Sequence, residues 1–162
     1  MAKFNQETAM IAVELQQLVS EFAYEVDTNG GLDITRFYAE DGAFAVGDFL
    51  HKGHEAISKF YSDRAKRIPD SHKDGIRVSS HMFLNMRVTV HDADTATVKF
   101  TNINFAGEGH PPVMGTIEPS MITDCFMDFR READDNWRIT LFSGKPLFVG
   151  NDPFTKSQLL KS

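Results

Sequence analysis

Disulfide bonds, membrane spans and secretion signals find no support in this sequence of 162 residues. Cys125 is the only cysteine, so an internal disulfide is excluded, and sparse cysteine is typical of a reducing compartment. No run of 18 apolar residues is present, and residues 1–10 lack the apolar stretch of a signal peptide. We therefore expect a cytoplasmic protein with no membrane partner.

Positive charge is also scarce. The chain carries 17 lysine and arginine residues against 23 aspartate and glutamate residues, which gives a net charge of −6. A protein that follows nucleic-acid phosphates needs a basic face, and no cluster of basic residues offers one. We therefore expect no nucleic-acid partner.

Motifs that hold cofactors are missing as well. The sequence contains no phosphate-binding glycine loop, no dinucleotide fingerprint and no nucleophile-elbow motif. His51 and His54 lie near Asp41 and Asp48, but their spacing matches no zinc site. We expect neither a cofactor nor a metal.

The chain is rich in phenylalanine, with 14 residues against three tyrosines and one tryptophan, and it has seven methionines. These side chains build apolar cores, and methionine also suits an adaptable apolar cavity. At this length, folding removes about 69% of the surface that the unfolded chain exposes, which is enough for a sizeable core. Residues 1–162 are therefore predicted to form one domain.

Helical spacing dominates the first half of the chain. Apolar residues recur at steps of three and four from Asn5, a predicted N-cap, to about Val26, and residues 29–31 (Asn-Gly-Gly) then end the helix. Three further elements are expected before the middle of the chain. They are a short helix over 33–40, a strand over 43–50 and a helix over 53–68, which ends because Pro69 follows.

Strand patterns fill the second half. The predicted strands cover residues 76–91, 94–106, 119–131 and 136–149. Residues 107–118 contain three glycines and two prolines, and we expect them to form a long loop that covers the mouth of a pocket. Helices followed by antiparallel strands predict an α+β domain with the helices on one face of the sheet.

Two residues are candidates for chemistry. Strict alternation places Met82 and Leu84 on one strand face and His81 on the other, so the pattern favours a histidine on a solvated face unless that face lines a pocket or a bulge shifts the register. Asp27 lies at the C-terminal end of the first helix, where a carboxylate opposes the helix dipole, and Tyr24 shares its helix face. Spacing alone leaves a solvated helix end and a functional pair both open.

The order of these segments resembles the SnoaL-like branch of the nuclear-transport-factor-2-like superfamily over about residues 8–148. The resemblance rests on Asp41-Gly42, on Gly53 to Ile57 and on residues 137–139 (Trp-Arg-Ile). It implies a cone-shaped α+β barrel, in which helices pack into a strongly curved mixed sheet and enclose a deep apolar pocket. The family contains dehydratases, dehydrohalogenases, isomerases, cyclases and non-catalytic proteins, so the fold does not determine the function.

Asp27 and His81 match positions at which members resembling scytalone dehydratase and hexachlorocyclohexane dehydrochlorinase pair an aspartate on the first helix with a histidine on the long strand. The resemblance therefore implies that His81 faces the cavity as a general base, with Asp27 as its partner. Phe22 stands where the dehydrochlorinase-type members carry a basic residue, which argues against a halide leaving group.

We accordingly expect a cofactor-independent lyase of the dehydratase type, or an isomerase, that acts on a small apolar substrate containing a ring. His81 and Asp27 would act with Tyr24, which would donate a hydrogen bond to the developing oxyanion. The residues expected to bind the substrate are Asn85, either Asn102 or Asn104, and the pocket phenylalanines Phe22, Phe83 and Phe126.

Two alternatives remain open at this stage. The chain is a non-catalytic binder of apolar ligands or an accessory subunit, or an enzyme with a different base such as Asp124. The apolar face that carries Met82, together with Leu147 and Phe148 near the C-terminus, also predicts a homo-oligomer, a dimer or a trimer.

Overall fold

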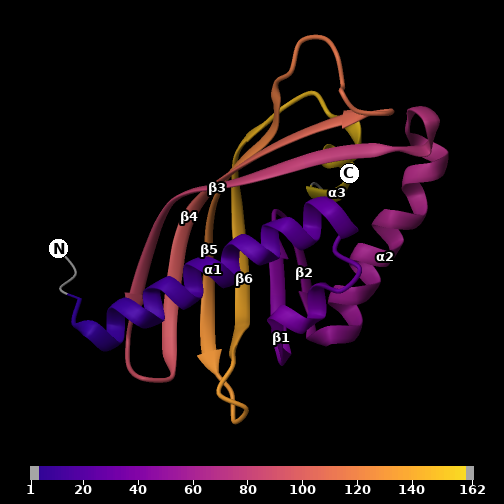
Figure 1. The fold of residues 1–162 in the computed structure, drawn as a ribbon. Helices are drawn as coiled ribbons and strands as arrows, with labels where there is room; N and C mark the ends of the chain where they lie inside the picture. The colour runs from indigo at the N-terminus through magenta and orange to yellow at the C-terminus, as the bar shows by residue number, and fades with distance from the viewer. Residues whose placement is uncertain (1–3, 160–162) are drawn as a thin grey trace.

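The computed structural model describes residues 4–159 and consists of three α-helices and one six-stranded sheet (Figure 1). The helices are α1 (Gln6–Asn29), α2 (Gly53–Ser71) and α3 (Pro153–Leu159), and short 3₁₀ turns η1 (Ile34–Phe37) and η2 (Lys73–Gly75) follow α1 and α2. The strands are β1 (Tyr38–Val46), β2 (Phe49–Lys52), β3 (Arg77–Val90), β4 (Thr95–Glu108), β5 (Pro119–Arg131) and β6 (Trp137–Val149).

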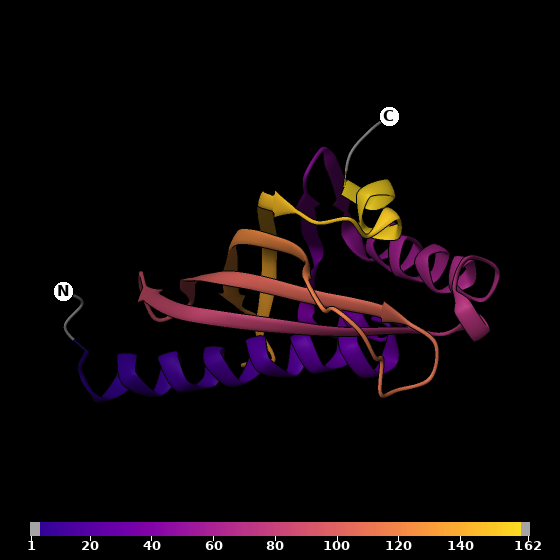
Figure 2. The same cartoon turned by 90° about the horizontal axis from the view of Figure 1, so that it is seen from above.

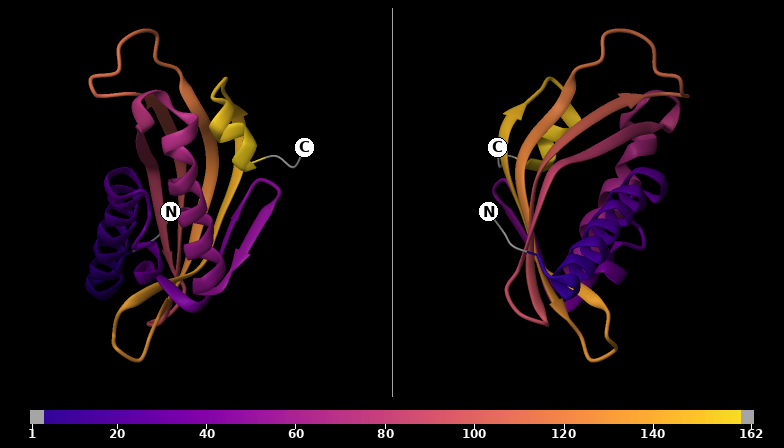
Figure 3. Two further views of the ribbon diagram at one scale, coloured as in Figure 1. Left: turned by 90° about the vertical axis from the view of Figure 1, so that its right-hand side faces the viewer. Right: turned by 60° about the vertical axis from the view of Figure 1, so that its left-hand side comes forward.

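The strands lie in the order β2-β1-β6-β5-β4-β3, and only β1 and β6 run parallel. Register shifts interrupt every pairing except that of β1 with β2, and such bulges bend a sheet. The sheet therefore curls around the helices without closing, as the two views in Figure 3 show. This curled mixed sheet confirms the predicted α+β cone.

Helix α1 begins where the sequence predicts. The Asn5 side chain accepts a hydrogen bond from the backbone N–H of Thr8 at 2.8 Å, and Thr8 Oγ1 accepts one from the backbone N–H of Asn5 at 2.9 Å. This reciprocal cap satisfies two N–H groups that a helix end would otherwise leave free. At the other end Gly30 takes the left-handed conformation and terminates the helix. Figure 2 shows α1 lying along β3, against which its apolar face packs.

Three predictions for the first half need correction. Residues 33–40 form only the short turn η1, because Tyr38 already pairs with Ile139 at the start of β1. The strand predicted over 43–50 is a hairpin of β1 and β2 that turns at Gly47, whose φ of 60° favours glycine. Helix α2 continues through Pro69 to Ser71, because a proline in the last turn removes only one backbone hydrogen bond.

The four strands of the second half are confirmed to within two residues at each end. Helix α3 was not expected from the sequence. Within residues 4–159, no helix is both long and apolar enough to cross a membrane.

The core lies between α1, α2 and the concave face of the sheet. Phe22 of α1 is 1% exposed and packs edge-to-face on Phe37, Tyr38 and Phe142, with ring centroids 5.5–6.0 Å apart. Such aromatic pairs add about 0.5–1.5 kcal/mol each to the hydrophobic gain. The core therefore fixes the C-terminal half of α1, which carries Asp27, against the sheet.

Candidate active site

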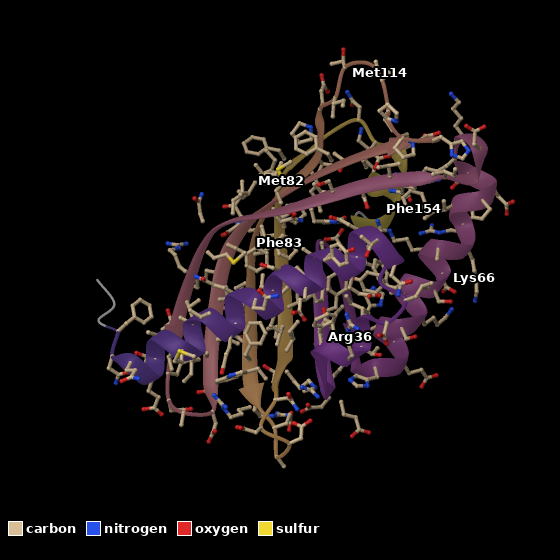
Figure 4. The ribbon with its side chains drawn as sticks, in the orientation of Figure 1. Arg36, Lys66, Met82, Phe83, Met114 and Phe154 are labelled. Carbon is tan, nitrogen blue, oxygen red and sulfur yellow. The ribbon has the colours of Figure 1, made fainter. Side chains whose placement is uncertain are left out.

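An apolar cavity lies on the concave side of the sheet, beside α1 and α2. Its volume is about 100 Å³, measured as the space open to the centre of a water molecule. An apolar protein cavity of about 150 Å³ can hold benzene, so one small ring is the upper limit for this smaller cavity. Figure 4 shows Phe83 on the side of β3 that faces α1. Seven phenylalanines line it: Phe22, Phe44, Phe49, Phe60, Phe83, Phe142 and Phe154.

Asp27 lies in the last turn of α1, and strand β3 holds its carboxylate with three donors. The backbone N–H of His81 donates to Oδ2 at 2.8 Å, and Ser79 Oγ donates to Oδ1 at 3.3 Å. The third contact joins Asp27 Oδ1 to Nδ1 of the His81 ring at 2.6 Å. These donors compensate for a carboxylate at the negative end of the helix dipole, where the last turn of α1 contains no basic residue.

The Asp27 contact determines which ring nitrogen of neutral His81 carries the proton. An ionised carboxylate only accepts hydrogen bonds, so Nδ1 is the donor and Nε2 keeps a lone pair. The side chains of His81 and Asp27 are 12% and 19% exposed, and His81 lines the cavity. Nε2 is therefore available to a ligand in the cavity as a hydrogen-bond or proton acceptor.

A bulge in β3 explains how a histidine from an alternating strand faces inward. Leu84 pairs with Thr101 and Arg87 with Lys99, so two residues of β3, Asn85 and Met86, face one residue of β4. Asn85 takes the left-handed conformation, with a φ of 56°, which asparagine tolerates better than most residues. The buried face of β3 changes from odd to even positions at this point. Residues 79, 81 and 83 face inward before the bulge, and residues 86, 88 and 90 face inward after it.

Strict alternation would place Met82, Leu84, Met86, Val88 and Val90 on one face of β3, and the bulge splits that face in two. Met82 and Leu84 remain outside, 42% and 43% exposed, whereas Val88 is 7% exposed and belongs to the core. Figure 4 shows Met82 on the side of β3 opposite to Phe83.

Polar side chains lie beside His81 on the cavity floor. His81 pairs with Asn104 across β3 and β4, and Phe83 pairs with Asn102, which pairs in turn with Thr123 of β5. Cross-strand partners present their side chains on one face, so these residues surround the imidazole. Six buried side-chain N or O atoms in residues 4–159 lack a hydrogen-bond partner, and five of them belong to cavity residues: His51 Nε2, Arg77 Nε, Asn102 Oδ1, Asn104 Oδ1 and Thr123 Oγ1. Unpaired buried polar atoms are costly, so this cluster is suited to a polar group of a ligand.

Two further titratable groups line the cavity in uncharged form. Burial lowers the pKa of the His51 imidazole, whose ring lies 4.7 Å from that of Phe60. Burial also raises the pKa of the Cys125 thiol to about 12, with a smaller contribution from Asp124. A thiol with such a pKa is not a nucleophile near neutral pH.

The C-terminal segment closes one side of the cavity, through Phe154 and Thr155. Arg77 holds this segment: its Nη2 lies 2.5 Å from Asp152 Oδ2 and donates to Thr155 Oγ1 at 3.2 Å, and its guanidinium lies 4.6 Å from the Phe154 ring centre. The predicted lid, residues 107–118, lies at the end of the sheet away from the two tight hairpins (Figure 1) but contributes no residue to this cavity. Helix α3 covers the cavity in its place.

Four candidate residues lie away from the cavity. Tyr24 is 71% exposed, because it lies about 200° around α1 from buried Phe22. Asn85 is exposed at the bulge, Phe126 is half-buried on the outer face of β5, and Asp124 is exposed on that same face. The remaining candidates, His81, Asp27, Asn102, Phe22 and Phe83, come together at the cavity.

Four further residues that line the cavity were not expected from the sequence: Arg64, Arg77, His51 and Phe154. Of these four residues, only Arg64 stands out in the sequence pattern. Arg64 lies seven residues after Ile57 and three after Tyr61, in the apolar stripe of α2, where a charged residue is unexpected. The other three come into position only through sheet curvature and the packing of α3.

The chain matches the SnoaL-like domain family over residues 8–143. No protein with a curated description matches it. Several solved structures have the same fold. A proposed scytalone dehydratase from Novosphingobium aromaticivorans has a TM-score of 0.72 and 13% identity, with 91% of each chain covered.

Two other structures extend the comparison. A protein from Catenulispora acidiphila in complex with S-DNPA has a TM-score of 0.68 and 16% identity, covering 85% of this chain and 94% of that chain. An NTF2-like protein with a cystatin-like fold, from Novosphingobium aromaticivorans, has a TM-score of 0.67 and 21% identity over 99% of each chain. Identities this low show a common fold and nothing finer. Because the family match spans most of the sequence and the curled sheet encloses an apolar cavity, this chain belongs to the SnoaL-like domain family.

Proposed function

We propose that the protein is a cofactor-independent lyase or isomerase in which His81 removes a proton from carbon. The observation that carries this proposal is the 2.6 Å contact between Asp27 Oδ1 and His81 Nδ1 beside an apolar cavity. An imidazole oriented by a carboxylate keeps one tautomer and gains a partner for its protonated form. A binding protein has no evident need for this pair, whereas a general base does.

The reaction begins when His81 Nε2 accepts a proton from a carbon next to a carbonyl group. The electron pair of the broken C–H bond forms a C=C bond, and the carbonyl oxygen takes the negative charge. In an isomerisation, His81 returns the proton to another carbon. In an elimination, a hydroxyl group on the next carbon leaves and takes up the proton to depart as water. A positioned base contributes about 10²–10⁴ to such a rate.

Tyr24 is too exposed to stabilise the oxyanion in the cavity. We assign this role to the amide groups of Asn102 and Asn104 and to the hydroxyl of Thr123, which lie on the strands next to His81. The asparagines can donate through their Nδ2 groups and Thr123 through its hydroxyl, whose oxygen has no partner within residues 4–159.

Proton exchange tests this function without knowledge of the natural substrate. The protein is incubated in D₂O with a panel of cyclic ketones and β-hydroxy ketones, and NMR measures deuterium uptake at carbon and loss of water. We expect exchange with wild-type protein and none with His81→Ala. His110→Ala, which removes an exposed histidine from the long loop, is the matched control and should exchange as wild type does. Equal exchange by wild type and His81→Ala would falsify the proposal.

A second candidate function is the binding of an apolar ligand without catalysis. It is favoured by the structure from Catenulispora acidiphila, in which a protein of similar fold is bound to S-DNPA. Ligand binding with no exchange on any ketone of the panel would support this alternative.

We also propose that two or more copies associate through the convex face of the sheet. Four apolar residues lie in one row across strands β3 to β6, because each pairs with the next: Met82, Ile103, Ile122 and Phe148. Met82 is 42% and Phe148 67% exposed. An apolar row of this kind on an otherwise acidic chain suits a second copy of the same face.

A further inference from the structure

Arg64 is a cation on the apolar face of α2 that lines the same cavity as His81. The helix buries Ile57 and Tyr61 fully, and Arg64 continues that stripe toward the cavity. Arg64 is half-buried, and burial lowers the pKa of its guanidinium; Arg77 lowers it further, whereas Tyr61, Asp27 and Asp152 act in the opposite direction. Because Arg64 and His81 both line this cavity, Arg64 and the Asp27–His81 pair belong to one site.

No carboxylate in residues 4–159 neutralises Arg64. The two carboxylates that raise the pKa of Arg64, those of Asp27 and Asp152, are already engaged. Asp27 accepts hydrogen bonds from Ser79 and His81, and Asp152 pairs with Arg77. Neither lies within the 4.0 Å that defines an ion pair with Arg64, although both influence its charge. A desolvated cation without a counterion is unfavourable unless a ligand supplies the negative charge.

The second arginine of the cavity defines the charge of that ligand. Arg77 has a side chain only 3% exposed, and Asp152 neutralises it at 2.5 Å. Arg64 is therefore the one cavity cation within residues 4–159 that lacks an anionic partner, which matches a single negative charge. A planar guanidinium also binds a carboxylate through two parallel hydrogen bonds.

We infer that the ligand of this cavity is a monocarboxylate with a small ring, whose carboxylate pairs with Arg64 while its ring lies among the phenylalanines near His81. This inference deepens the proposed function, because it names the class of substrate on which His81 would act. The cavity volume of about 100 Å³ limits the ring to about the size of benzene. Neutral molecules of the same shape should bind less well, because they leave Arg64 without a counterion.

The test compares benzoate with benzamide, which has nearly the same shape but no charge. Chemical shifts in ¹⁵N–¹H spectra of the whole protein, measured during titration, give a dissociation constant for each compound and the residues that respond. We expect benzoate to bind at least about tenfold more tightly than benzamide, with shifts at the cavity strands β3 and β4. Equal affinities, binding of neither compound, or shifts confined to another surface would overturn the inference.

Variants locate the effect at Arg64. Arg64→Gln should remove the preference for benzoate and leave benzamide affinity unchanged, whereas Arg64→Lys should keep part of it because the charge remains. Lys66→Gln is the matched control: it removes one positive charge from the same helix, and Figure 4 shows Lys66 on the outer side of α2. A benzoate preference that survives Arg64→Gln, or disappears in Lys66→Gln, would contradict the assignment.

The binding test and the exchange test fail independently. His81→Ala should still prefer benzoate, because Arg64 and not the base holds the carboxylate. If benzoate preference depends on Arg64 but no ketone exchanges deuterium, the anion site stands and the catalytic proposal is wrong. If exchange requires His81 but benzoate and benzamide bind equally, the catalytic proposal stands and the anion site is wrong.

Discussion

Replacing Asp152 with asparagine tests how the C-terminal segment is held over the cavity. Asp152 pairs with Arg77, whose side chain is 3% exposed, and it also accepts a hydrogen bond from Thr155. Asp152→Asn keeps the size of the side chain but leaves a buried guanidinium without its counterion. Breaking a buried ion pair from one side costs about 3–5 kcal/mol. Because Asp152 is 17% exposed and asparagine retains one oxygen acceptor, we expect the low end, about 3 kcal/mol.

Urea unfolding monitored by circular dichroism measures this loss. About 3 kcal/mol is a large part of the 5–15 kcal/mol typical of a domain, and it corresponds to a fall in Tm of roughly 6–12 °C at this chain length. Asp70→Asn is the control, since it removes an exposed carboxylate near the end of α2 and should change the free energy of unfolding by less than about 0.5 kcal/mol.

The loss of stability in Asp152→Asn should also depend on pH. Burial tends to raise the pKa of the Asp152 carboxyl, but hydrogen bonds from Arg77 and Thr155 outweigh burial and leave it below the ordinary value. A lowered folded-state pKa stabilises the fold above the unfolded-state pKa of about 3.9 and stops doing so as the pH falls through the folded value. The difference between wild type and Asp152→Asn should therefore be full at neutral pH and shrink below about pH 3.9. A difference under about 0.5 kcal/mol at pH 7 would refute the reasoning.

Three further predictions concern the dyad, the thiol and the outer face. Asp27→Asn should leave the circular dichroism spectrum unchanged but slow deuterium exchange by roughly 10²–10⁴, because asparagine does not hold His81 in one tautomer; a loss under about tenfold would contradict this role. Cys125, with a pKa of about 12, should react with a disulfide reagent at pH 8 about 10³-fold more slowly in the folded than in the urea-unfolded protein. Similar rates in both states would show that the thiol is accessible and ionised. Met82→Ser combined with Phe148→Ser should lower the sedimentation coefficient by dissociating the oligomer, and a wild-type protein that sediments as a monomer at micromolar concentration would refute the predicted interface.

Local patterns in the sequence were sufficient for most of the elements. The cap at Asn5, the stop at Gly30 and the alternation of strands β4, β5 and β6 depend on neighbours a few residues apart, so they are readable from the chain. The hairpin at Gly47 was missed because the pairing of β1 with β6 is long-range, and the continuation of α2 past Pro69 was missed because a proline in the last turn removes only one backbone hydrogen bond.

For the candidate site, too, local pattern and long-range information differ. The resemblance to the SnoaL-like family selected Asp27 and His81, which lie 54 residues apart, whereas strand alternation alone favoured a solvated histidine. The bulge at Asn85 explains why alternation misled: odd-numbered residues of β3 face inward before it and even-numbered residues face inward after it.

The sequence by itself determined helices α1 and α2, strands β3 to β6 and the apolar character of the cavity, and the family resemblance selected Asp27 and His81 as candidates. Only the tertiary structure decided that Tyr24 points to solvent, that α3 rather than the long loop covers the cavity, and that Arg77 is neutralised by Asp152 while Arg64 is not. The physical reason is how far apart along the chain the interacting residues lie. Caps, turns and alternation arise from contacts within a few residues, whereas the pairing of charges across 75 positions of the chain depends on how the sheet curls and on which side chains that curvature brings within hydrogen-bonding distance.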